Sequence, residues 1–173
     1  PVITLLGDAN VTVEAATSYA DAGATAQDAI GGNLTTAILL TGTVELNATG
    51  VRLLRYNVAD AGGTAAVEKV RTVNVVDTTS PVITLFGDAN ATHVINTAWV
   101  DPGTSATDTL DGNLSSQVAV SGALDVNATG NYVLTYSVSD AAGNDSNVTR
   151  TVNVTGAHAV QAAANLEMLW VEP

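Results

Sequence analysis

Apolar and polar residues alternate in several short stretches of this chain. From residue 132 to residue 138, tyrosine, leucine and valine occupy every second position, with mostly polar residues between them. Because successive side chains of a strand point to opposite faces, this pattern predicts a half-buried β-strand. Valines give residues 148–154 one apolar face as well, which predicts the returning strand of a hairpin. Shorter strands are expected at residues 82–85, 104–108, 117–121 and 123–126.

The pattern occurs twice. Residues 1–10 (PVITLLGDAN) recur eighty positions later as residues 81–90 (PVITLFGDAN), and later segments keep that spacing until Arg71, which corresponds to Arg150. The first repeat therefore has one extra residue between Asp60 and Arg71, which we expect at a hairpin tip because an insertion within a strand would flip its faces. A repeat of this length can bury its own core. The predicted domains are residues 1–80 and 81–155, followed by a tail at residues 156–173.

The fold class is predicted to be all-β. No segment before residue 156 has helical periodicity, and turn residues separate six or seven short strands in each repeat. Strands of this number and spacing are typical of a β-sandwich, so we expect two β-sandwiches in tandem. Within this fold class, Tyr56 and Tyr136 stand where a core tyrosine commonly bonds its hydroxyl to the backbone.

Charge and composition exclude several functions. The 173 residues carry a net charge of −12, which argues against binding to nucleic acid or to anionic membranes. No apolar run reaches the length of a membrane span, and the absence of cysteine excludes a disulfide framework. His93 and His158 have no counterparts in the other repeat and no nucleophile at a catalytic spacing, so we expect no enzymatic activity.

Four motifs carry a resemblance to a known family. They are PVITL-x-GD at residue 81, DPG-x-x-A-x-D at residue 101, DGNL at residue 111 and Y-x-V-x-DAAGN at residue 136. Together they resemble the bacterial immunoglobulin-like (Ig-like) domains also found in pesticidal crystal proteins, and they are similar to hyalin repeats. The first repeat departs from the pattern at Ala22 and Gly31, where the second has Pro102 and Asp111.

The resemblance implies two tandem Ig-like β-sandwiches in a larger bacterial protein that is extracellular or at the cell surface. Such a piece is expected to be monomeric, without catalysis and without membrane insertion. It would act as a structural spacer, as an adhesive module for a surface protein or glycan that uses exposed loops or a sheet edge, or as an accessory to an enzyme beyond Pro173. Residues 165–173 resemble the first strand of a formylglycine-generating-enzyme-like domain; the alternative is a linker strand or helix.

Acidic residues suggest a metal site. In an Ig-like sandwich the incoming linker and two loops meet at one end, and Ca²⁺ takes about six to eight oxygen ligands. We therefore predict a calcium site that stiffens the joint between the repeats; the alternative is that these residues only form turns. The first repeat, with Asp28, Asn33 and Asp60 alone, is a poorer site. The predicted ligands are Asp77, Asp108, Asp111, Asn113, Asp140 and Asn144.

Overall fold

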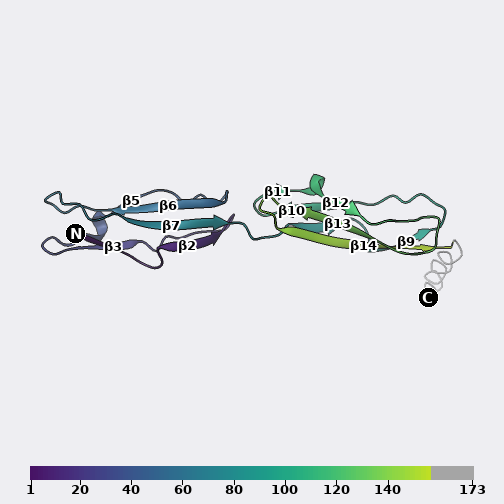
Figure 1. Ribbon diagram of the computed structural model, residues 1–173, viewed down its shortest axis with the longest axis horizontal. Coiled ribbons are helices and arrows are strands. Elements are labelled where there is room, and N and C mark those ends of the chain that lie inside the picture. Colours follow the sequence, from purple (N-terminus) through teal and green to yellow (C-terminus); the bar gives the residue numbers. More distant parts are fainter. Residues whose placement is uncertain (157–173) are drawn as a thin grey trace, which may run out of the picture. The chain divides into compact units, whose positions relative to one another are not determined.

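The computed structural model describes residues 1–156, and the predicted tail from residue 157 onward lies outside the described residues. The chain divides into two compact units, Pro1–Thr78 and one that begins at Thr79. Each unit is a β-sandwich of one three-stranded and one four-stranded sheet (Figure 1). The predicted fold class, two tandem Ig-like β-sandwiches, is confirmed. Among residues 1–156, the helices are three-residue turns that could not cross a membrane.

The first unit orders its strands as β1-β3-β4 in one sheet and β2-β7-β6-β5 in the other. A short 3₁₀ turn, η1 (Thr35–Ala37), connects the two sheets. The strands of the first unit are β1 (Val2–Leu5), β2 (Asn10–Glu14), β3 (Ala24–Asp28), β4 (Gly32–Asn33), β5 (Leu39–Thr41), β6 (Gly50–Asn57) and β7 (Lys69–Val76).

The second unit repeats this topology, with sheets β8-β10-β11 and β9-β14-β13-β12. Its hairpin β13–β14 is longer than β6–β7 and pairs from Gly130 with Val154 to Ser139 with Asp145. Its elements are β8 (Val82–Leu85), β9 (Asn90–Val94), β10 (Thr104–Asp108), β11 (Gly112–Asn113), η2 (Ser115–Gln117), β12 (Ala119–Ser121), β13 (Gly130–Ser139) and β14 (Asp145–Thr155).

In both units the first part of the chain crosses from one sheet to the other. β8 pairs antiparallel with β10, and a few residues later β9 pairs parallel with β14 in the opposite sheet. The crossing needs a sharp turn, which Gly87 supplies at a φ of +71°, a conformation that costs glycine nothing. β1 and β2 make the same crossing in the first unit.

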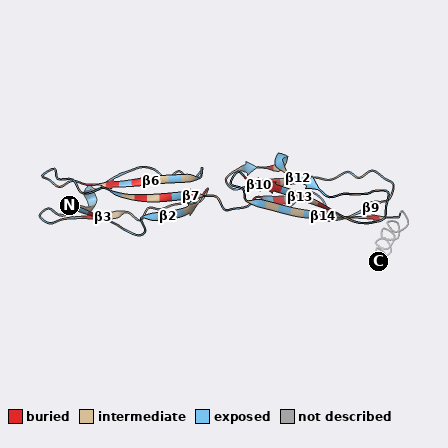
Figure 2. Ribbon diagram, in the orientation of Figure 1, coloured by how far each residue is buried: buried red, intermediate tan, exposed pale blue. Residues whose placement is uncertain are grey.

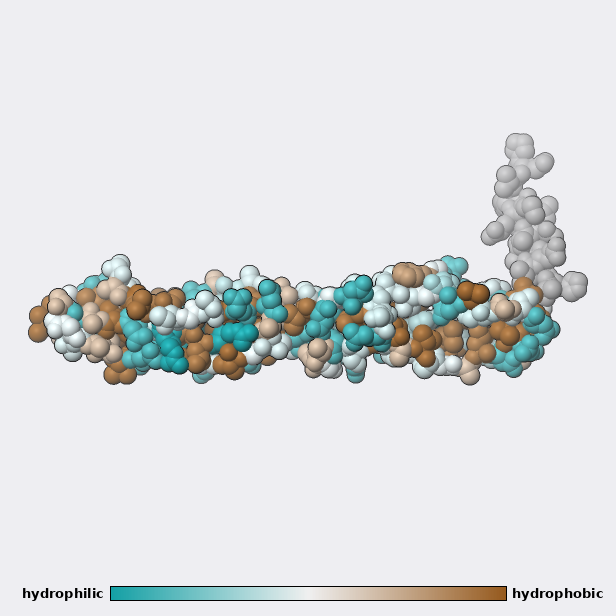
Figure 3. All heavy atoms as spheres, turned by 90° about the horizontal axis from the view of Figure 1, so that it is seen from above, coloured by the Kyte–Doolittle hydropathy of each residue, from teal (hydrophilic) through white to brown (hydrophobic). Residues whose placement is uncertain are grey.

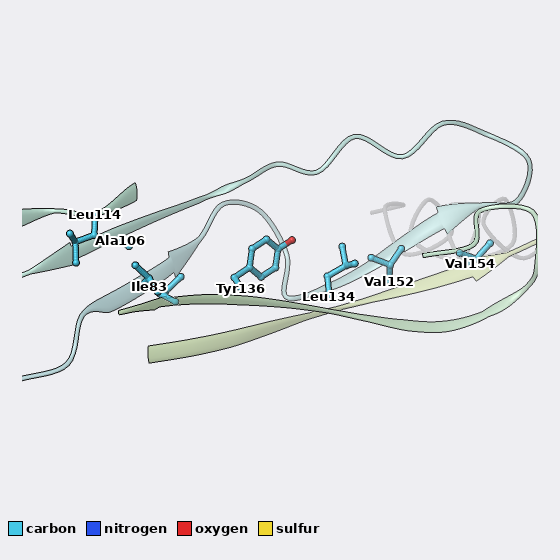
Figure 4. Close-up of a cluster of buried hydrophobic side chains, with 8 residues drawn as sticks. Ile83, Ala106, Leu114, Leu134, Tyr136, Val152 and Val154 are labelled. Carbon is cyan, nitrogen blue, oxygen red and sulfur yellow. The ribbon is translucent and has the colours of Figure 1, made fainter. Parts of the chain in front are cut away.

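Alternating side chains from the two sheets fill each core (Figure 2). In the second unit, Ile83 and Ala106 of one sheet face the other sheet, and Figure 4 shows this cluster with Tyr136 near its middle. Valine supplies most of the remaining apolar volume, as expected from a chain with few aromatic residues. On the visible surface in Figure 3, hydrophobic and hydrophilic residues are interspersed. The second core consists of Ile83, Ala106, Leu114, Leu134, Tyr136, Val138, Val152 and Val154.

Three details differ from the prediction. Residues 123–126 are not a strand, because the chain turns at Gly122, which has a φ of +107°. Val126 O instead accepts from Asn96 N at 2.8 Å. Only the last three residues of the predicted strand 117–121 form β12, after the turn η2. β9 was not predicted, because its sequence, NATHV, alternates weakly.

The extra residue of the first repeat is also placed differently. The hairpin tips correspond, since Asp60 N bonds Thr64 O as Asp140 N bonds Asn144 O. Beyond the tip, Ala59 pairs with Ala65, whereas Tyr56 pairs with Lys69. Three steps along the first strand, from Tyr56 to Ala59, therefore stand opposite four steps along the second, from Ala65 to Lys69. The extra residue of the second strand is a β-bulge. The prediction of an insertion at the tip was wrong, because a bulge absorbs the residue without flipping the strand beyond it.

Candidate functional site

A fully buried arginine lies in the core of the second unit. Arg150 is 0% exposed, and its Nε donates to Asp88 O at 3.1 Å. One terminal nitrogen donates to Phe86 O and the other forms an ion pair with Asp101. The guanidinium therefore supplies donors to two backbone carbonyls of the segment that crosses between the sheets.

Tyr136 completes this cluster. Its hydroxyl donates to Asp101 Oδ2 at 2.5 Å, and the Arg150 guanidinium carbon lies 5.5 Å from the centre of its ring. The expected bond from this hydroxyl to the backbone was therefore wrong: its acceptor is a carboxylate. Burial and the bond to Asp101 raise the pKa of Tyr136 to about 12. Burial acts to raise the pKa of Asp101, but bonds from Tyr136, Gly103 and Arg150 hold it below its usual value.

The first unit contains the same cluster. Arg71 is 1% exposed, donates from Nε to Asp8 O at 2.9 Å and pairs with Asp21. Tyr56 donates to the other oxygen of Asp21 at 2.5 Å, and burial followed by this bond raises its pKa. All these groups are engaged with one another, so the cluster is a structural clamp and lacks a reactive group.

The sequence contained a signal for this clamp. Arg71 and Arg150 are two of only five basic side chains in the chain, they recur at the same place, and each alternates with the inward valines of its strand. A charge at an inward position of a strand predicts a buried partner. Asp21 and Asp101 looked like ordinary turn residues, so their pairing could not be read locally.

The acidic loops of the second unit contain one unusual carboxylate. Asp108 is only 8% exposed, and its Oδ1 accepts from Leu110 N at 2.7 Å and from Asp111 N at 2.9 Å. Its Oδ2 is buried and has no hydrogen-bond partner among residues 1–156. A carboxylate oxygen of Asp111 lies within 4.8 Å of a carboxylate oxygen of Asp108. Two acidic groups are therefore close together, and one of them has an oxygen that is shielded from water.

Asp111 also connects this loop to the tip of the β13–β14 hairpin. Its Oδ2 accepts from Ala141 N at 2.7 Å. A hollow of about 220 Å³ adjoins Asp111, Asp140 and Ala141. Asn144 Nδ2 lies 3.4 Å from Thr79 O, so both loops are at the end where the chain enters the unit.

The other predicted ligands in this unit are occupied by turns. Both oxygens of Asp140 accept from Asn144, from its backbone and its side-chain nitrogen, each at 2.8 Å. Burial acts to raise the pKa of Asp140, but these bonds hold it below its usual value. Asn113 Oδ1 accepts from Ser115 N at 3.0 Å and is turned into its own loop. Asp77 belongs to the first unit, and its contribution stays a prediction.

The first unit has the same turn without the second carboxylate. Asp28 Oδ2 accepts from Ile30 N at 2.9 Å and from Gly31 N at 2.6 Å. These bonds, from Gly31 first, lower the pKa of Asp28 to about 2. Gly31 stands where the second unit has Asp111, so no second carboxylate can approach from that position.

The family follows from both repeats. Residues 3–75 and 83–154 each match the family described as Bacterial surface protein, Ig-like domain. The chain belongs to this family. Membership of this family indicates that the Ig-like pair is extracellular or at the cell surface. Comparison with curated proteins finds no match.

Several solved structures are similar to parts of this Ig-like pair. A lipoprotein from Bacteroides thetaiotaomicron is 27% identical over 44% of this chain and 38% of its own, with a TM-score of 0.41. The M60 catalytic domain of Clostridium perfringens ZmpB with its CBM51-1 and CBM51-2 domains is 14% identical over 89% of this chain and 30% of its own, with a TM-score of 0.49. A structure of CBM51-2 in complex with GlcNAc and INT domains, from the same protein, is 34% identical over 44% of this chain and 16% of its own, with a TM-score of 0.37. The chain spans less than two fifths of each.

Proposed function

We propose that this Ig-like pair is a non-catalytic stalk or adhesive segment of a larger secreted or surface protein, stiffened by Ca²⁺. The parallel ladder in each unit supports the stalk. β2, near the start of the first unit, pairs in parallel with β7 at its end, from Asn10 with Thr72 to Glu14 with Val76. Opposite forces on the two ends of the unit would slide these strands along each other. All the ladder hydrogen bonds would then resist together, whereas a hairpin opens one bond at a time.

A proline in this ladder should weaken the first unit under force. Thr72 N donates to Ala9 O and Ala15 N donates to Val76 O, so alternate residues of β2, including Val13, face β7. Val13→Pro would remove one donor from the loaded ladder and should lower the unfolding force in single-molecule pulling. Thr12→Pro is the matched control, because its N–H points away from β7 at the sheet edge. Equal forces for both variants would contradict the stalk mechanism.

The buried Oδ2 of Asp108 supports the calcium site. A carboxylate oxygen removed from water without a partner is costly, and a divalent cation would offset that cost. Asp108 and Asp111 would supply oxygens beside the hollow. Backbone carbonyls and water would complete the shell, as they do around Ca²⁺ in other flexible oxygen sites. The ion would tie the Asp108 loop to the hairpin tip at the end where the chain enters.

Calcium should therefore raise the melting temperature of the second unit. A ligand present at about one hundred times its Kd adds roughly 2.7 kcal/mol, or about 10–20 °C for a domain of this size. Asp108→Asn and Asp111→Asn keep the turn acceptors, remove the charges and should abolish the shift in calorimetry against EDTA. Asp125→Asn, an exposed turn carboxylate of the same unit, is the charge-matched control. Asp77→Asn tests the remaining predicted ligand.

If wild type shows no shift, the calcium site is wrong, while the stalk proposal stands on the force measurement. A shift retained by both loop variants would place the ion elsewhere.

A further inference from the structure

A polar groove of about 400 Å³ lies on the outer face of the four-stranded sheet of the second unit. Its centre is a row across three strands, in which Ala119 pairs with Ser137 and Ser137 pairs with Asn147. Ser139 and Asp145 form the next row toward the hairpin tip, and Gln117 borders the groove from η2. The volume lies within the range of small-molecule sites, roughly 300–1,000 Å³.

The side chains of this groove can both donate and accept hydrogen bonds. Gln117 and Asn147 each offer an amide oxygen and an NH₂ group, and Ser137 offers a hydroxyl. None of these three side chains makes a hydrogen bond within residues 1–156. The Ser139 hydroxyl donates to Oδ1 of Asp145, so Oδ2 of the same carboxylate remains an acceptor for a ligand.

The first unit differs at the same place. Leu39 stands at the position of Ala119 and puts a large apolar side chain, 63% exposed, in the row. Asn57, at the position of Ser137, donates to Glu68 at 2.9 Å, and Arg55 pairs with the same carboxylate at 2.7 Å. The polar side chains of the first unit therefore bond to one another, whereas those of the second unit remain available to a ligand.

We propose that this groove binds one neutral hexopyranose unit of a glycan. Neighbouring sugar hydroxyls would donate to Asp145 Oδ2 and to the amide oxygens, and would accept from the NH₂ groups of Gln117 and Asn147. The Asp145 carboxylate and the net charge of −12 repel acidic sugars. Without an aromatic platform the affinity for a monosaccharide is weak, with a Kd on the order of 1 mM. The proposal deepens the adhesive role in the proposed function and is independent of calcium.

The test is a titration of the isotope-labelled chain with glucose, galactose, mannose and N-acetylglucosamine, followed by amide chemical shifts. At least one sugar should give saturable shifts confined to the groove. Ala119→Leu, which copies the first unit, should abolish them, and Asn147→Ala should weaken binding about tenfold. Asn153→Ala lies on the outer face of β14 beyond the groove and should bind as wild type does.

Absence of saturable groove shifts with all four sugars would overturn the proposal, as would unchanged binding by Ala119→Leu. Urea unfolding of each variant checks that it is folded. Either negative result leaves the force and calcium measurements, and hence the stalk, unaffected.

Discussion

Replacing Arg150 with methionine should destabilise the second unit by about 3–5 kcal/mol, the usual cost of removing one partner from a buried ion pair. Methionine fills much of the volume but leaves Asp101 without its cation and the carbonyls of Phe86 and Asp88 without donors. A domain has only about 5–15 kcal/mol of stability, so the variant should lie near the limit of folding. Urea unfolding measures the loss.

The surface pair of the first unit provides the comparison. A terminal guanidinium nitrogen of Arg55 lies 2.7 Å from a carboxylate oxygen of Glu68, but the two side chains are 46% and 36% exposed. Arg55→Met should therefore cost no more than about 1 kcal/mol. A loss from Arg150→Met as small as this would mean that water reaches the cluster and that the clamp is not what holds the crossing segment.

Replacing Gly122 with alanine should be similarly damaging. A Cβ at this position would lie 2.3 Å from the backbone oxygen of Val133, well inside contact distance, and the residue has a φ of +107°. Because the obstacle is backbone, the chain between β12 and β13 must shift, and we expect a loss of about 3 kcal/mol or more in urea unfolding.

Gly143→Ala separates the two causes of that loss. Gly143 has a φ of +89°, but a Cβ there would meet nothing within 4 Å. It should show only the conformational cost, about 1–2 kcal/mol. If both variants lose the same amount, the close approach of Gly122 to β13 is not a constraint.

The candidate site was only partly readable from the sequence. The loops that carry Asp108 and Asp111 could be recognised because acidic turn residues cluster there. The sequence does not tell which oxygens are free to bind a cation, because that depends on the hydrogen bonds that each side chain accepts. Asp140 and Asn113 accept hydrogen bonds within their own loops, whereas Asp108 Oδ2 is buried without one among residues 1–156. The open groove was not recognised because it depends on the register that places Ala119, Ser137 and Asn147 in one row across three strands.

The sequence by itself determined the period-two strands, the two repeats and the all-β class, because each of these is carried by neighbouring residues or by direct recurrence. Tertiary structure alone decided the crossing of β8 and β9 between sheets, the bulge before Lys69 and the union of Arg150, Asp101 and Tyr136. These depend on burial: a guanidinium enclosed between two sheets must find acceptors wherever the fold places them. Local pattern specifies which face of a strand is buried, but closure of the sandwich specifies what meets there.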